Sequence, residues 1–188
     1  MKRNTNWLLL IFLMTCFYLP LQAQQRGVYT VLQAGGMFGV SATNDQSTMY
    51  GYQFQVVFGR NFYDRMYLGI GLGNDVYRGR SSVQVNGSRS SRRINTLPIY
   101  ADFRVPFAGL SPVGTFGILA DAGYAPSIGA DFFKGFVGKA GITYSLFLAE
   151  GSDLQFSAGY GIQQFDSRFS GNAYSQHNVF ITVGLFVH

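Results

Sequence analysis

Hydrophobic side chains recur at every second position through most of this chain, and this alternation restricts its fold more than any other feature. Between Met66 and Leu72 the even positions hold large apolar residues, and the odd positions hold tyrosine and glycine. A period of two places the two sets on opposite faces of an extended strand, whereas a helix has a period near 3.6. The pattern therefore predicts β-strands with one large apolar face and one small or polar face.

The same pattern recurs along the chain, with turn-forming residues between the segments. We predict eight strands, near residues 28–40, 50–58, 66–76, 96–105, 116–124, 136–148, 154–162 and 179–187. Shorter connections alternate with mostly longer ones, as expected for an up-and-down barrel with tight turns at one end and loops at the other.

The composition argues against an ordinary water-soluble domain. Hydrophobic residues make up 47% of the chain and charged residues only 12%, whereas an average soluble domain has about 25% charged residues. So apolar a chain is not disordered, and a single cysteine does not make a disulfide scaffold. A length of 188 residues fits one domain. After the first twenty or so residues, no apolar run is long enough for a spanning helix.

The first residues have the features of a secretory signal peptide. Two basic residues precede an apolar run from Trp7 to Leu21, and Leu21-Gln22-Ala23 ends it with a small residue. The run contains a proline and is too short to span a bilayer as a helix. We therefore expect residues 1–23 to be a signal peptide and residues 24–188 to form the barrel domain. An uncleaved anchor helix is the alternative. Cys16 lies in the leader, so the mature chain would contain no cysteine.

The position of the charges predicts which face of the strands meets lipid. The mid-strand charges all fall on the glycine-rich face: Asp75, Asp102, Arg104, Asp121 and Lys139. A soluble barrel carries charge on its outer face, whereas a membrane barrel confines charge to its lumen and loops. In water, the large apolar face would exceed the few hundred Å² that soluble monomers tolerate. We expect this face to contact lipid and the glycine-rich face to line the lumen.

The leader, the eight alternating segments and the last segment, VFITVGLF at residues 179–186, together resemble a known family. The chain resembles the small eight-stranded outer-membrane β-barrels, which include the OmpX-like proteins and the OmpA-like transmembrane domains. The resemblance is one of pattern and covers the whole mature chain. It implies an all-β, eight-stranded antiparallel up-and-down transmembrane β-barrel, monomeric, secreted across the inner membrane and placed in the bacterial outer membrane by the barrel-insertion machinery. A departure is the ending at His188, because such barrels often finish on an aromatic residue.

The predicted lumen face has enough polar residues to fill a narrow barrel. Eight strands enclose a space just wide enough for side chains. A turn centred on Ala130 would make Asp121 and Lys139 cross-strand neighbours, and we expect them to form an ion pair, since an isolated buried charge is costly. The predicted polar plug consists of Asp75, Tyr100, Asp102, Arg104, Asp121 and Lys139. We expect a structural network without an open channel; a narrow pore for small solutes is the alternative.

A second candidate site is the basic connection at residues 79–91. Asn86-Gly87 strongly favours a two-residue hairpin turn. Centred there, the turn would pair Val85 with Ser88, Arg80 with Arg93, Arg78 with Asn95 and Asp75 with Pro98. The arginines expected on its outward side are Arg78, Arg80, Arg89 and Arg93. Guanidinium groups bind phosphate well, so we expect contact with lipopolysaccharide phosphates or another anionic surface ligand. A solvated basic loop is the alternative.

The sequence gives little support for catalysis, a metal or a cofactor. A register centred near Gly171 and Asn172 would set Asp166 opposite His177, with serines nearby, and some small outer-membrane barrels that remodel lipid A use histidine and serine at such a rim. These residues are also common in loops, so we expect no enzyme. With two histidines and no mature cysteine we expect neither metal nor cofactor. The weak net charge suggests no nucleic-acid partner. A periplasmic ligand-binding barrel is a further alternative.

Overall fold

All regular secondary structure in the described part of the chain is β-strand. A computed structural model describes residues 27–43, 48–85, 88–111, 114–128, 132–166 and 173–188, so the predicted signal peptide lies outside it. The strands are β1 (Val28–Ala42), β2 (Tyr50–Phe62), β3 (Met66–Val85), β4 (Ser88–Thr96), β5 (Ile99–Ser111), β6 (Gly114–Ala125), β7 (Gly135–Ala149), β8 (Ser152–Asp166) and β9 (Ala173–Val187). Within these ranges there is no helix with the length and apolar character needed to cross a membrane.

The strands form one antiparallel sheet that closes on itself through the pairing of β1 with β9. β4 and β5 both pair with β3, and Leu97 and Pro98 alone separate them, so together they form one of eight walls. The break has a local cause, because proline has no N–H to donate to the ladder. Its carbonyl still accepts a hydrogen bond of 2.8 Å from the N–H of Gly73. The predicted all-β, eight-stranded antiparallel barrel is therefore confirmed.

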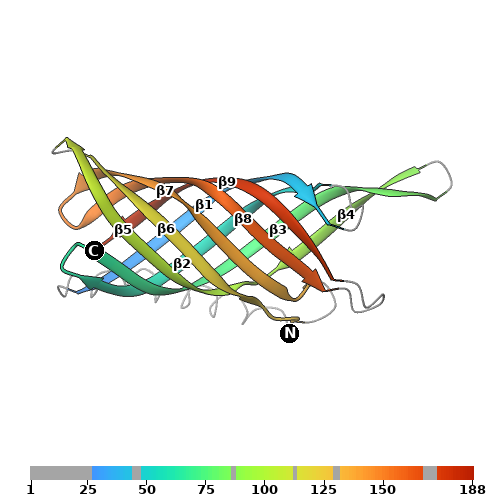
Figure 1. Ribbon diagram of the computed structural model, residues 1–188, viewed down its shortest axis with the longest axis horizontal. Coiled ribbons are helices and arrows are strands. Elements are labelled where there is room, and N and C mark those ends of the chain that lie inside the picture. Colours follow the sequence, from blue (N-terminus) through green and yellow to red (C-terminus); the bar gives the residue numbers. More distant parts are fainter. Residues whose placement is uncertain (1–26, 44–47, 86–87, 112–113, 129–131, 167–172) are drawn as a thin grey trace, which may run out of the picture.

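The two ends of the barrel differ (Figure 1). At one end the paired strands β3 and β4 continue beyond the rest of the wall, and we call this the hairpin end. At the other, short turns at residues 63–65 and 150–151 join β2 to β3 and β7 to β8, and we call this the turn end. The predicted alternation of short and longer connections corresponds to these two ends.

Segment 132–134 completes the wall at the hairpin end. β6 ends at Ala125 and β7 begins at Gly135, and the intervening chain contacts strands on both sides of the gap. The N–H of Phe133 donates to the carbonyl of Asn95 on β4 over 3.0 Å, and the N–H of Asp166 on β8 donates to the carbonyl of Lys134 over 2.9 Å. The connection thus links β4 to β8 at the hairpin end, beyond the ends of β6 and β7.

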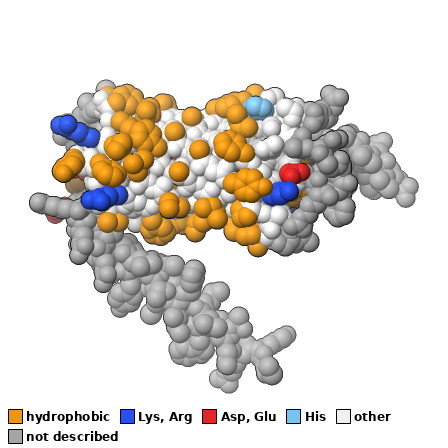
Figure 2. Space-filling model, turned by 60° about the horizontal axis from the view of Figure 1, so that its bottom comes forward, with side chains coloured by type: hydrophobic (Ala, Val, Ile, Leu, Met, Phe, Trp, Pro, Cys, Tyr) orange, Lys and Arg blue, Asp and Glu red, His pale blue; other side chains and the backbone are white. Residues whose placement is uncertain are grey.

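The alternation separates outward from inward side chains as predicted. On the outer surface Leu68, Ile70 and Ile142 are 42%, 66% and 56% exposed. The charged residues of the predicted lumen face are all buried: Asp75, Asp102, Arg104, Asp121 and Lys139. Figure 2 shows hydrophobic side chains spread over the barrel wall, with charged side chains toward the two ends of the visible face. The outer surface therefore has the polarity of a wall that meets an apolar solvent.

Candidate functional site

Two apolar clusters and a polar network fill the interior. One cluster consists of Met37, Met49, Tyr77, Ile94, Leu119, Phe165, Tyr174 and Phe180, with Phe133 packed against it. The other consists of Tyr29, Val31, Val57, Tyr67, Tyr100, Val137 and Phe186. These side chains point inward from several strands, as expected for a barrel of this size. The polar network lies among them and is the candidate functional site.

Lys139 on β7 reaches across the lumen to β3 and β2. Its Nζ atom lies 3.0 Å from Oδ2 of Asp75 and 2.5 Å from Oε1 of Gln53. Only 3% of the lysine side chain and none of the aspartate side chain is exposed. Both charges are therefore removed from solvent, and their mutual pairing offsets part of the cost of burial.

The predicted ion pair between Lys139 and Asp121 is wrong, although the predicted register is correct. The two residues are cross-strand neighbours, yet the ammonium group binds Asp75 instead. A lysine side chain is long enough to cross a narrow lumen, so an acceptor on the opposite wall competes with the neighbour on the adjacent strand. Among the described side chains, Asp75 has no other ion-pair partner.

Arg104 on β5 forms the second centre of the network. Its Nε donates to both carboxylate oxygens of Asp102 over 3.0 Å, and its Nη2 also lies 3.0 Å from Asp102 Oδ2. Nη1 donates to Oε1 of Gln155 on β8, and Nη2 to Oε1 of Gln33 on β1. Asp102 also accepts a 2.7 Å hydrogen bond from the hydroxyl of Tyr29 on β1. The guanidinium group thereby connects three separate walls through the lumen.

Asp121 and Tyr100 lie inside the barrel without joining these ion pairs. They are 4% and 3% exposed. Asp121 Oδ1 and the Tyr100 hydroxyl have no hydrogen-bond partner among the described residues. Asp121 is also the cross-strand neighbour of Asp102. The structure therefore places all six predicted lumen residues inside, and links four of them in two ion pairs.

The predicted network omitted its amide members. Gln33 donates to Gln55 over 2.5 Å, and Gln55 donates to Gln53 over 3.4 Å. These glutamines connect the Arg104 centre with the Lys139 centre along β1 and β2. Their alternation with apolar neighbours was the available signal, because it places them on the inward face.

The basic hairpin presents Arg78 and Arg93 together. They are direct cross-strand neighbours on β3 and β4, and both side chains are exposed. The guanidinium carbon of Arg78 lies 5.8 Å from the ring centroid of Tyr52. Nε of Arg93 donates to Oδ1 of Asn95 over 3.2 Å. Two guanidinium groups thus share one side of the ribbon at the base of the hairpin.

The predicted register of this hairpin holds at its tip and is wrong at its base. Val85 pairs with Ser88 as predicted, but Arg80 pairs with Ser91 rather than Arg93, Arg78 with Arg93 rather than Asn95, and Asp75 with Thr96 rather than Pro98. Between Arg80 and Gln84 the register shifts, and β3 accommodates two more residues than β4. A shift of two keeps every side chain on its predicted face. The turn Asn86-Gly87 and the side chains of Arg80 and Arg89 lie outside the described residues.

The Asp166 and His177 rim cluster is not assembled. Asp166 pairs with Ala173, and His177 pairs with Ile162, so the predicted opposition of the two residues is wrong. Asp166 Oδ2 instead lies 2.9 Å from Nζ of Lys134. His177 Nδ1 lies 2.6 Å from the Tyr160 hydroxyl. The predicted turn centre, Gly171-Asn172, lies outside the described residues.

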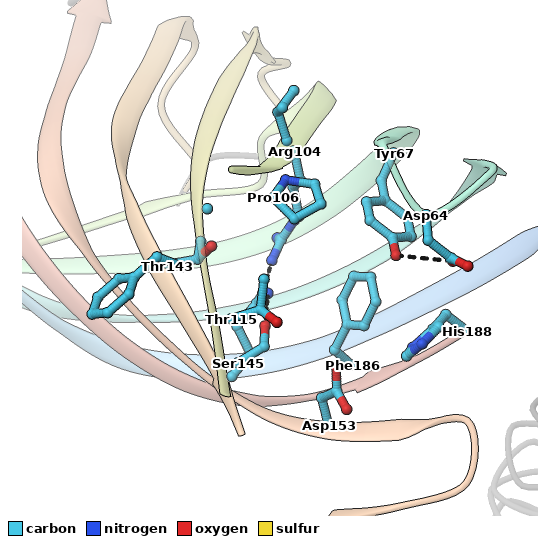
Figure 3. Close-up of a pocket in the computed structure, with 14 residues that line it drawn as sticks. Asp64, Tyr67, Arg104, Pro106, Thr115, Thr143, Ser145, Asp153, Phe186 and His188 are labelled. Atoms are coloured by element: carbon cyan, nitrogen blue, oxygen red, sulfur yellow. Dashed lines mark hydrogen bonds between the residues drawn. The ribbon is translucent and has the colours of Figure 1, made fainter. Parts of the chain in front are cut away.

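A cavity of about 210 Å³ lies at the turn end of the lumen. Arg104, Thr143 and Ser145 line its inner part, and Phe186 and His188 are among the residues nearer the end of the barrel (Figure 3). Gln155 also lines the cavity. Figure 3 also shows the Tyr67 hydroxyl directed at Asp64, a hydrogen bond of 3.3 Å. In the described ranges no three histidine, cysteine or acidic residues are grouped so that they could hold a metal ion.

Comparison with known proteins identifies the fold. No known family profile matches the chain, and no curated protein matches it. Among solved structures, the outer membrane protein OprG from Pseudomonas aeruginosa aligns over 88% of this chain and 97% of its own, with 10% identity and a TM-score of 0.55. Neisserial surface protein A aligns over 85% of this chain and 96% of its own, with 16% identity and a TM-score of 0.49. The likeness to OprG confirms the predicted barrel architecture at the level of fold.

Proposed function

We propose that this chain is an integral outer-membrane β-barrel protein with an occluded lumen, and that its basic hairpin binds lipopolysaccharide phosphates. Two features support the membrane location. The outer wall exposes large apolar side chains while the charges lie inside, and OprG, which shares the fold, is an outer membrane protein. A closed barrel pairs all its strand edges, which suits both insertion in hydrocarbon and a monomeric state. As for other barrels, we propose assembly by the insertion machinery after secretion.

The observation that carries the occlusion is that polar side chains meet across the lumen from non-adjacent walls. Lys139 on β7 binds Asp75 on β3, and Arg104 on β5 contacts Gln155 on β8. An ion passing through would have to separate buried ion pairs, which costs several kcal/mol when a partner is left uncompensated. The apolar clusters fill further parts of the interior.

Planar-bilayer recording tests this occlusion. The purified, refolded chain is expected to give no steady conductance, in parallel with an open porin that verifies the bilayer. Large, steady channels from the chain would contradict an occluded lumen and favour the narrow solute pore.

The hairpin proposal rests on Arg78 and Arg93. Two exposed, adjacent guanidinium groups repel each other unless an anion lies between them, and guanidinium forms charge-assisted, bidentate bonds with phosphate. Aromatic side chains lie beside them, since Tyr50 is the cross-strand neighbour of Arg78 and Tyr52 lies under its guanidinium group. The hairpin end would therefore face outward, at the height of the lipid headgroups.

Lipopolysaccharide binding to detergent-solubilised barrels measures this contact. The double variant Arg78→Gln/Arg93→Gln is expected to retain less lipopolysaccharide than the unsubstituted chain. Arg60→Gln is the matched control, because Arg60 is an exposed arginine of β2 near the turn end whose guanidinium also lies over an aromatic ring, that of Phe62. Equal retention by the double variant would exclude these arginines as the phosphate site.

A further inference from the structure

The inner faces of β7, β8 and β9 form a wall of mostly small and polar residues. The register aligns them in cross-strand rows, from the turn end toward the hairpin end: Ser145 with Gln155 and Gly184; Thr143 with Ser157 and Thr182; Gly141 with Gly159 and Phe180; Lys139 with Gly161 and Asn178; and Val137 with Gln163 and Gln176. Lys139 is the one charged residue in these rows, and its partner Asp75 lies on β3; Arg104 and Asp102 pair with each other on β5.

Several polar atoms of this wall lack hydrogen bonds among the described residues. They are Ser157 Oγ, Thr182 Oγ1, Asn178 Oδ1, Gln163 Oε1 and Gln176 Oε1. All five residues are at least 95% buried. A buried polar atom without a partner costs about 1–3 kcal/mol. Five such atoms along one wall, which we call the polar stripe, would therefore destabilise the folded barrel considerably. Buried water normally satisfies polar groups of this kind.

The stripe begins at the cavity of the turn end. Thr143 and Gln155 line that cavity, and Ser157 is the cross-strand neighbour of Thr143. Thr182 is the next neighbour in the same row. The unpartnered hydroxyls of Ser157 and Thr182 therefore lie immediately beyond the cavity wall.

Phe180 interrupts the stripe one row further on. Its side chain is 2% exposed and lies over the inner wall, since a Cβ atom added to Gly159 would come within 2.8 Å of its Cζ atom. Beyond the ring, Asn178, Gln163 and Gln176 continue the polar surface toward the hairpin end. The phenyl ring thus lies between two polar parts of one wall.

We propose that the cavity continues along β7–β9 as a pocket for water and small uncharged solutes, and that Phe180 is its end wall. The lining beyond the cavity offers hydroxyl and amide groups, which suit neutral hydrogen-bonding molecules. The two cations nearby are already bound, Arg104 by Asp102 and Lys139 by Asp75. An anionic solute would lose its hydration and find neither cation free, which is unfavourable in a buried site. This pocket rests on the proposed occlusion, because it is closed toward the hairpin end.

Single cysteines test the pocket, since the described strands contain no native cysteine. In a Cys16→Ser background, the variants are Thr143→Cys in the cavity, Thr182→Cys before Phe180, Asn178→Cys after it, and Ile181→Cys on the outer face. Each is refolded into liposomes, checked for the mobility of the unheated barrel on a gel, and treated with hydroxyethyl methanethiosulfonate. Ser157→Cys replaces Thr182→Cys should the latter not fold.

Thiol reactivity follows access to the reagent, so Thr182→Cys should react about tenfold or more faster than Asn178→Cys and Ile181→Cys. Adding Phe180→Ala to Asn178→Cys should raise its rate to that of Thr182→Cys, whereas Phe180→Leu should leave it low.

Protection of Thr182→Cys and Ser157→Cys at the level of Ile181→Cys would overturn the pocket. Equal reactivity of Asn178→Cys with Phe180 intact would overturn its role as the end wall. Conductance by the unsubstituted chain would refute the occlusion instead, whatever the labelling shows.

Discussion

Removing Lys139 should destabilise the barrel strongly, because it would leave a fully buried carboxylate without its cation. Lys139→Met keeps the unbranched apolar part of the side chain and deletes the ammonium group that lies 3.0 Å from Asp75 Oδ2 and 2.5 Å from Gln53 Oε1. Asp75 Oδ1 already lacks a hydrogen bond among the described residues. Breaking a buried pair by deleting one partner costs about 3–5 kcal/mol, and we expect a loss of unfolding free energy in this range.

The double variant Asp75→Leu/Lys139→Met should recover most of that loss. Replacing both charges by apolar groups is often neutral or stabilising, so the two substitutions should be far from additive. Urea unfolding of liposome-embedded barrels, followed by the gel mobility of the unheated protein, gives the free energies for a double-mutant cycle. Additive losses would refute the direct pairing inferred from the 3.0 Å contact.

Lys134→Met is the matched control for this cycle. Lys134 also forms a lysine–aspartate pair, 2.9 Å from Asp166, but the two side chains are 40% and 39% exposed. Solvent-exposed pairs contribute about 0–1 kcal/mol. A loss for Lys134→Met as large as that for Lys139→Met would show that burial is not what sets the cost.

Two further substitutions test the wall itself by the same unfolding measurement. Ile142→Arg places a charge in the middle of β7 on the outer face and should lower the unfolding free energy in a bilayer by about 2–4 kcal/mol. Val40→Arg, near the hairpin end, should lower it by about 0–1 kcal/mol. Equal losses would mean that Ile142 does not face the centre of the lipid layer. Gly71→Ala places a methyl group against the ring of Tyr100 and should cost about 1–3 kcal/mol by overpacking. Gly36→Ala is its control, because its added Cβ would lie 3.4 Å from the nearest atoms, those of the Phe38 ring. A similar loss there would show that the collision with Tyr100 is not what destabilises Gly71→Ala.

The faces of the strands could be predicted from sequence because they depend only on parity. Leu68 and Ile142 lie outside and Asp102 and Lys139 inside, and a strand cannot exchange these faces without a slip of one residue. Even the two-residue shift in the hairpin left Arg78 and Arg93 on the predicted exposed face. The number of walls was also predictable, because each alternating segment of the sequence forms one wall. Leu97 and Pro98 interrupt one of these walls without adding another.

Partners within the lumen could not be predicted in the same way. Register specifies neighbours along the hydrogen-bonding direction, and it correctly placed Asp121 beside Lys139. The choice of Asp75 depends instead on the width of the lumen and on the reach of a flexible side chain across it. Long connections posed a different problem, because they do not fix the register of the strands that they join. Asp166 pairs with Ala173 and not with His177, so the one arrangement that suggested catalysis is not formed.

The glycines of the inner face explain how so narrow a barrel holds large aromatic rings. A Cβ atom at Gly69 would collide with the Tyr29 hydroxyl, one at Gly71 with the Tyr100 ring, and one at Gly159 with Phe180. Each ring therefore occupies space that a glycine on another strand leaves free. A glycine-rich stripe could have indicated an open pore, because small side chains widen a lumen. Here the stripe is filled by tyrosine and phenylalanine, and the Tyr29 hydroxyl continues into the charged network through Asp102. Gly69, which makes room for Tyr29, thus also lets the tyrosine hydroxyl reach Asp102, so that at this point the filling of the lumen and the paired charges depend on one packing arrangement.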